Sequence, residues 1–329
     1  MAEIKKVLCT AYISEENKEK LRQALAPAEV TFKVFMDKAG IAEAGKDVDV
    51  AIFNGDLEES VLQSPNLKWI HCCRAGVEKS AIPEVFERGI ILTSSSGRSA
   101  PALAEHSLMF MMALTYDLPM LHCAQQAHKW AVSREYAQRT GLYGKTVGII
   151  GLGKTGCELA RLCKTGFGMK VLGYRRSYAV PEYVDEVYAS AQGDTVDPIL
   201  EQADYVVLCI ELNDETWHLM GEKQFARMKK SAYLINMGRG GLVDEPAMIR
   251  ALQDGTIAGA GLDTFEQEPL QQDSPLWDLP NVIITPHCTP KLPDFEERML
   301  SYVFTNIEAY KNDGKFVNRV TERNIFHKK

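Results

Sequence analysis

Short apolar runs alternate with helix-like patterns along the whole chain, and this alternation limits the fold more than any other feature. It predicts parallel sheets whose faces are covered by helices. A chain of 329 residues is longer than one hydrophobic core usually supports, so two domains are expected. The expected strands are 5–10, 30–35, 48–53, 67–71 and 90–92 in the first part and 147–150, 170–174, 205–210, 233–236, 258–262 and 282–285 in the second.

The same pattern predicts domain limits at 1–100, 101–288 and 289–329. Helices are expected from the N-cap Ser14 through Leu21 and Leu25, and over 80–87, ended by Gly89. The second part has strands enough for one doubly wound domain, which begins with the helix near Pro101. The tail looks helical over 296–311 and has no expected strands of its own. We therefore expect it to return to the first domain, which makes that domain discontinuous.

A glycine-rich turn directly follows the expected strand 147–150 and opens a helix. Gly151 allows a tight turn, Gly153 lets the backbone approach a pyrophosphate, and Gly156 allows close packing of helix on strand. The first helical residues, Lys154 and Thr155, lie where backbone N–H groups can bind phosphate. The alternative is a plain strand-to-helix turn. The strand, turn, helix and second strand in this order favour a dinucleotide site.

The end of the second strand of that unit indicates which dinucleotide binds. An NAD site usually has a carboxylate here for the ribose 2′-hydroxyl, but the chain has Arg175, Arg176 and Ser177. Two guanidiniums and a hydroxyl suit the 2′-phosphate of NADP(H), so NADP(H) is expected to be preferred over NAD(H). The alternative is a solvated basic loop at a strand end.

Three further candidates, Arg239, Glu268 and His287, each follow the carboxyl end of an expected strand, where open α/β sheets bind ligands. Taken singly, each could be a surface or structural residue. Together they match the reduction of a 2-oxo acid, in which nicotinamide supplies only the hydride. An imidazolium can donate the proton, a carboxylate can orient the imidazole and raise its pKa, and arginine can bind the substrate carboxylate.

At these motifs the chain resembles the D-isomer-specific 2-hydroxyacid dehydrogenases, over 67–78, 104–106, 144–156, the Arg239 segment, 263–270 and 274–287. The resemblance implies that Arg239 binds the substrate carboxylate, that His287 is the acid/base and that Glu268 is its partner. It implies that backbone N–H groups of the substrate loop, Arg74, Ala75, Gly76 and Val77, bind the carboxylate too. It also implies that Asp263 contacts the nicotinamide carboxamide, that Met237 and Gly238 lie near the ring, and that the protein is a homodimer formed through the cofactor domain.

The sequence departs from the family pattern in places. His287 is followed by Cys288, Thr289 and Pro290, where the family often has small residues, and Glu211 stands in a loop that usually reads Leu-Pro-Leu. The pair Glu105–His106 on the helix after Pro101 is interpreted as a buried structural pair. The fold class expected overall is α/β with two doubly wound domains, a Rossmann cofactor domain inserted in a flavodoxin-like substrate domain.

Composition excludes several other classes. With 37 Lys and Arg against 44 Asp and Glu, the net charge is −7, which disfavours nucleic acid and anionic membranes as partners. No apolar run is long enough to span a bilayer and the first residues do not resemble a signal peptide, so a cytoplasmic location is expected. Eight cysteines without a CxxC pair fit neither a disulfide framework nor a zinc cluster, and no metal is expected.

The sequence therefore predicts NADPH-dependent reduction of a small 2-oxo acid to the D-2-hydroxy acid. Two alternatives stay open. One is oxidation of another small anion such as formate, which is disfavoured because formate dehydrogenases of this superfamily have Gln where Glu268 stands. The other is a nucleotide-sensing binding protein on the same fold, which the three candidate residues do not exclude.

Overall fold

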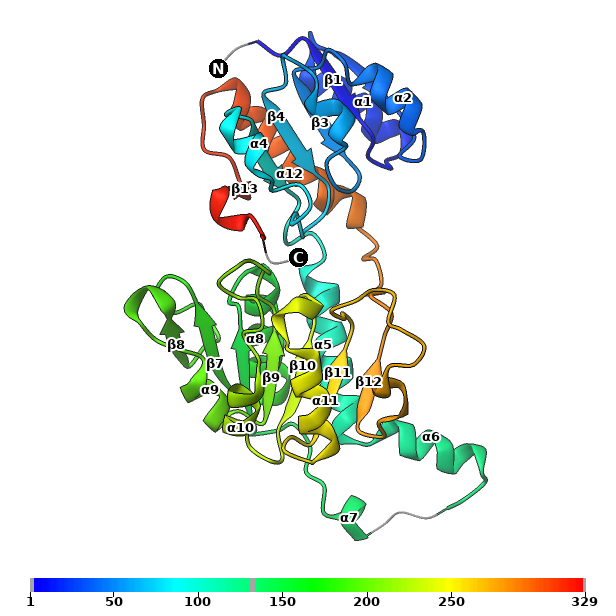
Figure 1. Cartoon of the computed structure of the whole chain (residues 1–329), viewed down its shortest axis with the longest axis vertical. Helices are drawn as coiled ribbons and strands as arrows, with labels where there is room; N and C mark the ends of the chain where they lie inside the picture. The colour runs from blue at the N-terminus through cyan, green and yellow to red at the C-terminus, as the bar shows by residue number, and fades with distance from the viewer. Residues whose placement is uncertain (1–2, 131–133, 328–329) are drawn as a thin grey trace. The chain divides into compact units, whose positions relative to one another are not determined.

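The computed structural model describes residues 3–130 and 134–327, and the chain forms two compact units (Figure 1). The first unit contains Met1–Arg98 and Leu292–Lys329, and the second contains Ser99–Lys291. Each unit is a sheet with helices on its faces. The α/β class expected from the sequence is confirmed.

The first unit is built on the parallel strands β1 (Lys6–Cys9), β2 (Glu29–Phe32), β3 (Val50–Phe53), β4 (Trp69–Cys72) and β5 (Ile91–Ser94). Their order, β5-β4-β3-β1-β2, is that of flavodoxin-like sheets. A short strand, β13 (Arg319–Val320), pairs antiparallel with β5. The helices are α1 (Glu15–Leu25), α2 (Lys38–Ala44), α3 (Glu59–Leu62), α4 (Pro83–Glu87), α12 (Phe295–Lys311) and the short η4 (Glu322–Asn324).

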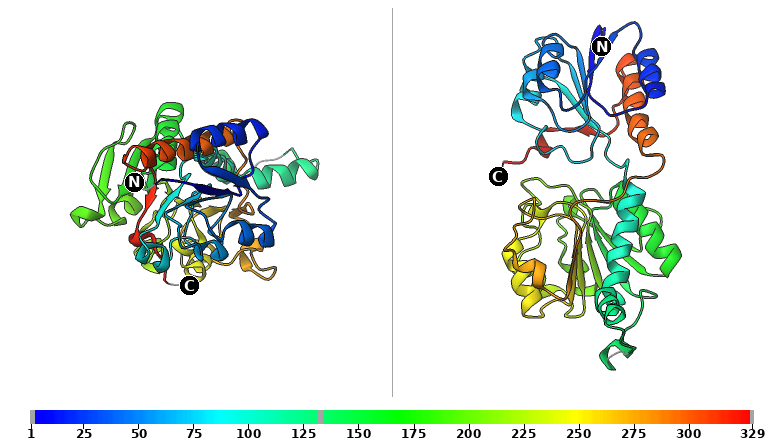
Figure 2. Two further views of the ribbon diagram at one scale, coloured as in Figure 1. Left: turned by 90° about the horizontal axis from the view of Figure 1, so that it is seen from above. Right: turned by 90° about the vertical axis from the view of Figure 1, so that its right-hand side faces the viewer.

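Hydrogen bonds and ring packing fix the tail helix α12 in this first unit. Helix α12 lies beside α1 (Figure 2), and the Glu296 carboxylate accepts hydrogen bonds from the backbone N–H of Ser14 and the side chain of Asn17. Ser14 caps α1 by accepting from the backbone N–H of Asn17, as expected. In the core, Trp69 of β4 stacks on Tyr310 of α12 at 6.0 Å between ring centroids.

The second unit is a seven-stranded parallel sheet in the order β12-β11-β10-β9-β6-β7-β8. Renumbered from β6, this is the Rossmann order 3-2-1-4-5-6 with a seventh strand added. Its strands are β6 (Thr146–Ile150), β7 (Lys170–Arg175), β8 (Glu186–Ala189), β9 (Tyr205–Leu208), β10 (Tyr233–Asn236), β11 (Gly259–Leu262) and β12 (Val282–Ile284). Its helices are α5 (Ala100–Thr115), α6 (Leu118–Gln126), α7 (Arg134–Ala137), α8 (Lys154–Phe167), α9 (Asp197–Gln202), α10 (Glu222–Arg227) and α11 (Glu245–Gln253), with short helices η1 (Ser190–Gln192), η2 (Gly240–Leu242) and η3 (Pro275–Asp278).

The structure corrects four details of the expected pattern. Strand β8 was not expected, because only one of its four residues is buried and it shows no apolar run. The tail does carry a strand, β13, whose two residues are too few to give a periodic signal. The helix expected over 80–87 begins only at Pro83, since Ser80 instead accepts a hydrogen bond from the backbone N–H of Leu57. Strand β2 ends at Phe32 rather than at residue 35.

The sequence predicts no segment that spans a membrane, and the lengths and hydropathy of the helices can be compared with this prediction. Among the residues that the structure describes, no helix is both long and apolar enough to cross a bilayer.

A buried carboxylate joins three strands of the first unit. Asp49, 6% exposed, accepts hydrogen bonds from the backbone N–H groups of Lys5 and Lys6 and from Lys68 Nζ, at 2.8, 2.9 and 2.6 Å. Burial alone would raise the pKa of Asp49, but these bonds outweigh it and hold the pKa below its ordinary value of 3.8. The ionised carboxylate therefore stabilises the fold.

We expect Asp49→Asn to lower the free energy of unfolding by about 1.5–3 kcal/mol at pH 7, because charge-assisted hydrogen bonds are lost. Since folding lowers this pKa, the stabilisation is complete above the unfolded pKa of about 4 and is lost as the pH falls through the folded value. Urea unfolding at pH 7 and pH 3 measures the difference. The control is Asp47→Asn, whose carboxylate forms an exposed pair with Lys6 and should matter little. Equal losses in the two variants would contradict this assignment.

Candidate active site

The three candidate catalytic residues follow three neighbouring strands of the second unit. Arg239 follows β10, Glu268 follows β11 and His287 follows β12. Because these strands are parallel and adjacent, their carboxyl ends meet at one edge of the sheet. The fold therefore brings residues distant in the sequence to one place.

His287 and Glu268 form a direct pair at this edge. Nδ1 of His287 lies 2.8 Å from Oε2 of Glu268, and the side chains are 43% and 37% exposed. The other carboxylate oxygen, Oε1, accepts a hydrogen bond from the backbone N–H of Phe265 at 3.1 Å. Glu268 is thus held by its own loop and in turn holds the imidazole ring, whose Nε2 points away from the carboxylate.

Close backbone packing brings the Arg239 segment against the loop that carries Glu268. A Cβ added at Gly240 would lie 1.8 Å from the carbonyl carbon of Phe265, so only glycine fits there. Asn236 Nδ2 donates to the carbonyl oxygen of Arg239 at 3.0 Å, and Arg239 Nη1 donates to the carbonyl oxygen of Gly238 at 2.8 Å. The structure therefore places Glu268 and His287 in contact and packs the loop of Arg239 beside them.

A mainly apolar cavity of about 430 Å³ adjoins the His287–Glu268 pair. Its wall is contributed by the loops after β11 and β12, and it can lower the local dielectric around the pair. The lining residues besides the pair are Phe265, Pro269, Leu270, Trp277, Ile284 and Pro286.

The turn that carries His287 is held by Asp263, a contact that the sequence did not indicate. Asp263, only 2% exposed, accepts hydrogen bonds from Thr285 Oγ1 at 2.6 Å, from the backbone N–H of Cys288 at 3.1 Å and from Thr289 Oγ1 at 3.3 Å. His287 itself has a left-handed φ of 51°. The expected contact between Asp263 and nicotinamide stays a prediction.

The expected Glu105–His106 pair is not a buried pair. Glu105 is exposed, whereas His106 is 7% exposed and faces the interior of the unit. Consecutive helical residues point in directions about 100° apart, which explains why only one of the two is buried.

The glycine turn between β6 and α8 has the shape expected of a phosphate site. Gly151 has a φ of 108°, and a Cβ there would lie 2.6 Å from the backbone of Cys209. At Gly156 a Cβ would lie 2.1 Å from the carbonyl oxygen of Gly151. At Gly153, by contrast, a Cβ would meet no atom within 4 Å, so this N-cap of α8 is open to a ligand. Lys154 and Thr155 begin the helix, and their N–H groups belong to its first turn.

Arg175 ends β7, and Arg176 and Ser177 follow it on the surface. Arg175 Nη1 donates to the carbonyl oxygen of Ala179 at 3.3 Å. The backbone N–H groups of Gly151 and Leu152 donate to the carbonyl oxygen of Tyr174, the residue before Arg175, at 2.9 and 3.2 Å. The arginine and the glycine turn thus lie in one region of the second unit. Their joint binding of a 2′-phosphate stays a prediction.

Met237 and Gly238 lie immediately beyond β10. Met237 is buried, and its backbone N–H donates to the carbonyl oxygen of Leu208 at 3.2 Å. The backbone N–H of Gly238 donates to Asn236 Oδ1 at 3.1 Å. Both residues follow the strand that leads to Arg239, and their place beside nicotinamide stays a prediction.

The expected substrate loop lies in the first unit, after β4. Arg74 Nη1 pairs with Asp56 Oδ2 at 2.7 Å, and Asp56 Oδ1 accepts from Ser80 Oγ at 3.3 Å. In the same loop Ala75 is exposed, Gly76 is half-buried and Val77 is buried. The loop therefore has a defined shape at the carboxyl edge of its own sheet, and its part in substrate binding stays a prediction.

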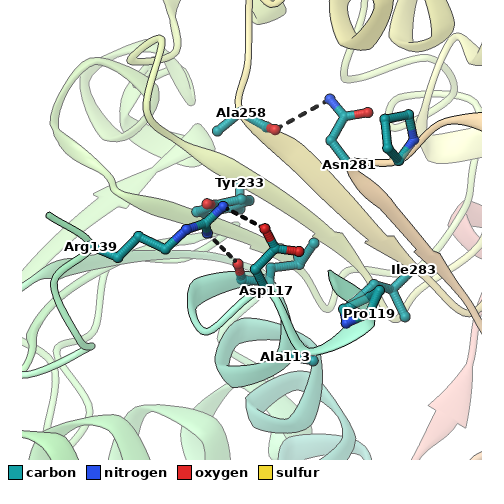
Figure 3. A pocket seen from close by; sticks show the side chains of 10 residues that line it. Ala113, Asp117, Pro119, Arg139, Tyr233, Ala258, Asn281 and Ile283 are labelled. Atoms are coloured by element: carbon teal, nitrogen blue, oxygen red, sulfur yellow. Dashed lines mark hydrogen bonds and ion pairs between the residues drawn. The ribbon is translucent and has the colours of Figure 1, made fainter. Parts of the chain in front are cut away.

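A second cavity in this unit, of about 250 Å³, lies near residues at or just before the amino ends of β10, β11 and β12 (Figure 3). Arg139 donates there to the carbonyl oxygens of Leu114 and Thr115 and to Asp117 Oδ2, at 3.1, 3.2 and 2.9 Å. These bonds satisfy the last carbonyl groups of α5. We interpret this cavity as structural, because its charged groups are used to end a helix.

Comparisons with known proteins agree with this geometry. The family model described as "D-isomer specific 2-hydroxyacid dehydrogenase, NAD binding domain" matches residues 108–289. The glyoxylate reductase of Korarchaeum cryptofilum (strain OPF8) is 34% identical over 279 residues, which cover 83% of each chain.

Two solved structures share the whole architecture. An NADPH-dependent glyoxylate/hydroxypyruvate reductase from Sinorhizobium meliloti, in complex with NADP and sulfate, has a TM-score of 0.78 and 26% identity over 97% of this chain and 98% of that one. The NAD-complexed form of a D-isomer specific 2-hydroxyacid dehydrogenase from Lactobacillus delbrueckii ssp. bulgaricus has a TM-score of 0.75 and 26% identity, over 96% and 100%. With the matched family model, these findings show that the chain belongs to the D-isomer specific 2-hydroxyacid dehydrogenases, a family of NAD(P)-dependent oxidoreductases.

Proposed function

We propose that this enzyme uses NADPH to reduce a small 2-oxo acid to the D-2-hydroxy acid, with His287 as the proton donor. The observation that carries the proposal is the 2.8 Å pair of His287 with Glu268 at the carboxyl edge of a Rossmann sheet. The names of its relatives, glyoxylate reductase and glyoxylate/hydroxypyruvate reductase, support substrates of this size and charge.

The residues of the proposed site have different roles in the reaction. Nicotinamide, when bound, supplies the hydride. His287 donates a proton from Nε2 to the carbonyl oxygen of the substrate, and Glu268 keeps the ring oriented through Nδ1. The Arg239 guanidinium binds the substrate carboxylate and polarises the adjacent carbonyl. Backbone N–H groups of the loop Arg74, Ala75, Gly76 and Val77 in the first unit would serve as further donors to the substrate, as the family resemblance implies.

The cofactor is proposed to bind along the glycine turn. Gly151, Gly153, Lys154 and Thr155 would hold the pyrophosphate, because the N-cap of α8 is open and helix N-termini favour anions. Arg175, Arg176 and Ser177 would hold the 2′-phosphate. Met237, Gly238 and Asp263 would line the nicotinamide end.

We also propose that two copies associate through the second unit and that the enzyme works in the cytoplasm. Helix α6 has no buried residue, and apolar side chains around it are exposed. Exposed apolar surface of this kind favours association between copies. The side chains are Met109, Met112, Tyr116, Leu118 and Trp130.

The proposal is tested by turnover of glyoxylate, hydroxypyruvate, pyruvate and branched 2-oxo acids with NADPH. We expect His287→Ala to lower kcat by about a hundredfold or more while the Kd for NADPH changes little. In Glu268→Gln the carboxylate that holds the ring through Nδ1 is replaced by an amide, so kcat should also fall while the Kd for NADPH changes little. Near-normal kcat in His287→Ala would refute the acid assignment. Cofactor binding with no turnover of any acid would favour a nucleotide-sensing protein.

Cofactor preference has a separate test at Arg175. A 2′-phosphate there gains charge-assisted hydrogen bonds of about 1.5–3 kcal/mol each before desolvation, and about 1.4 kcal/mol already gives a tenfold preference. We therefore expect kcat/KM for NADPH to exceed that for NADH by at least about tenfold. Arg175→Asp should reverse the preference, because a carboxylate repels the phosphate and accepts from the ribose hydroxyl. Comparable kcat/KM values for both cofactors in the unchanged enzyme would mean that the arginines only face solvent.

The open N-cap of α8 predicts a difference between two glycines. Gly153→Ala places its Cβ in open space, so we expect a stability loss under about 1 kcal/mol but a Kd for NADPH raised at least about tenfold. Gly156→Ala forces the Cβ against a backbone carbonyl and should cost about 1–3 kcal/mol of stability. Thermal unfolding and fluorescence titration with NADPH distinguish the two effects. Unchanged NADPH affinity in Gly153→Ala would argue against the proposed pyrophosphate site.

A further inference from the structure

His106 is a buried imidazole on α5 that contacts both ends of the turn carrying His287. Its Nε2 lies 3.1 Å from Thr285 Oγ1 and its Nδ1 lies 2.9 Å from Thr289 Oγ1. His287 lies between the two threonines in sequence, and its backbone N–H donates to the carbonyl oxygen of Thr285 at 3.0 Å. One ring therefore connects the two sides of the turn.

The packing of α5 on β11 explains how His106 reaches this position. A Cβ added at Gly261 would overlap the ring of Phe110, so glycine lets the helix approach the strand closely (Figure 2 shows α5 along the sheet). His106 lies one helical turn before Phe110, about 6 Å along the axis, and stacks on it at 4.8 Å. Asp263 lies two residues beyond Gly261, also about 6–7 Å along the strand. The distance along α5 from Phe110 to His106 agrees with the distance along β11 from Gly261 to Asp263. His106 and Asp263 therefore lie at the same height along the sheet.

A neutral ring satisfies both hydrogen bonds of the imidazole. The Thr285 hydroxyl donates to Asp263 Oδ1 at 2.6 Å, so its oxygen accepts from His106 Nε2–H. Nδ1 then accepts from the Thr289 hydroxyl at 2.9 Å, and because that hydroxyl has one hydrogen, its 3.3 Å contact with Asp263 Oδ2 is an alternative to this bond. Burial lowers the pKa of His106, although the Asp263 carboxylate opposes this shift, which agrees with a neutral ring at pH 7. Each ring nitrogen of His106 therefore has a hydrogen-bond partner on one side of the turn.

We propose that His106 is a positioning residue for His287: by binding Thr285 and Thr289 together with Asp263, it holds the turn in the conformation that keeps the His287 ring on Glu268. This inference rests on the proposed role of His287 as proton donor. His287 has a left-handed backbone with a φ of 51°, which is uncommon for an L-residue and costs energy that surrounding contacts can offset. These contacts are the bonds from His106 and Asp263 to the two flanking threonines.

The experiment is a double-mutant cycle between His106 and Thr289. His106→Gln keeps a donor that can reach Thr285 but loses the group at Nδ1, and Thr289→Val removes the hydroxyl at nearly constant volume. We expect each variant to lower kcat about tenfold with the Kd for NADPH changed less than twofold, because a misplaced acid slows the chemical step. The double variant should lose about tenfold, not about a hundredfold, because both changes break the same hydrogen bond.

A matched control is Ser107→Ala on the same helix. Ser107 is also buried, but its hydroxyl donates only within the helix, to the carbonyl oxygen of Leu103 at 2.8 Å. Its kcat should stay within twofold of the unchanged enzyme. A loss in Ser107→Ala as large as in His106→Gln would mean that any damage to α5 has this effect, and would overturn the proposal.

Two measurements separate this proposal from the one on which it rests. NMR spectra of the protein without cofactor should show shifted resonances of the His287 imidazole protons in His106→Gln and in Thr289→Val, and thermal unfolding reports whether the fold survives. If His287→Ala is inactive but both variants keep native kcat and native His287 resonances, the positioning role is wrong. Losses that multiply to about a hundredfold in the double variant would also overturn it. Full activity of His287→Ala would instead refute the proton donor.

Discussion

Parallel pairing of β10, β11 and β12 is the constraint on which the site depends. The register places Asn236 opposite Leu262 and Leu262 opposite Ile284, so the three strands end level with one another. The loops that follow all begin at the same edge of the sheet. They bring the side chains of Glu268 and His287 into contact. In an antiparallel sheet alternate loops would leave from opposite edges and the same residues would be separated by the strand length. The site is therefore a direct consequence of strand direction, supported by close backbone packing at Gly240.

The alternation of apolar runs and helices was sufficient to predict most of this fold, because buried parallel strands leave a strong signal in sequence. Strand β8 gave no such signal, since it lies at the sheet edge and its residues are mostly half-buried or exposed. The candidate active-site residues could be found because each follows a strand end and belongs to a chemically meaningful set. The pairing of His287 with Glu268 confirms that two of them meet, whereas their roles in catalysis stay predictions.

The contacts of His106 could not have been found in the same way. Its two threonine partners are separated from it by 179 and 183 residues, and such long-range hydrogen bonds leave no periodic pattern. The sequence offered two separate hints: a histidine on an apolar helix, and Thr289 at a position where the family often has small residues after the histidine that corresponds to His287. Only the close approach of α5 to β11 at Gly261 connects them. The departure from the family pattern at Thr289 thus has a physical explanation, because its hydroxyl contacts both His106 and Asp263.

Two histidines and two carboxylates lie at this edge of the sheet, and they differ in how far they are exposed to solvent. Asp263 and His106 are buried, and their hydrogen bonds go to threonine hydroxyls and a backbone N–H, which fixes geometry at low cost because each polar atom has a partner. Glu268 and His287 are roughly two-fifths exposed and bind each other, so the imidazole is accessible to solvent. In the proposed reaction the imidazole takes up a proton from water in every cycle, which requires this exposure, whereas the groups proposed to orient it are shielded from water. The boundary between these environments runs through the turn from Thr285 to Thr289, whose two ends are half-buried and whose centre is exposed.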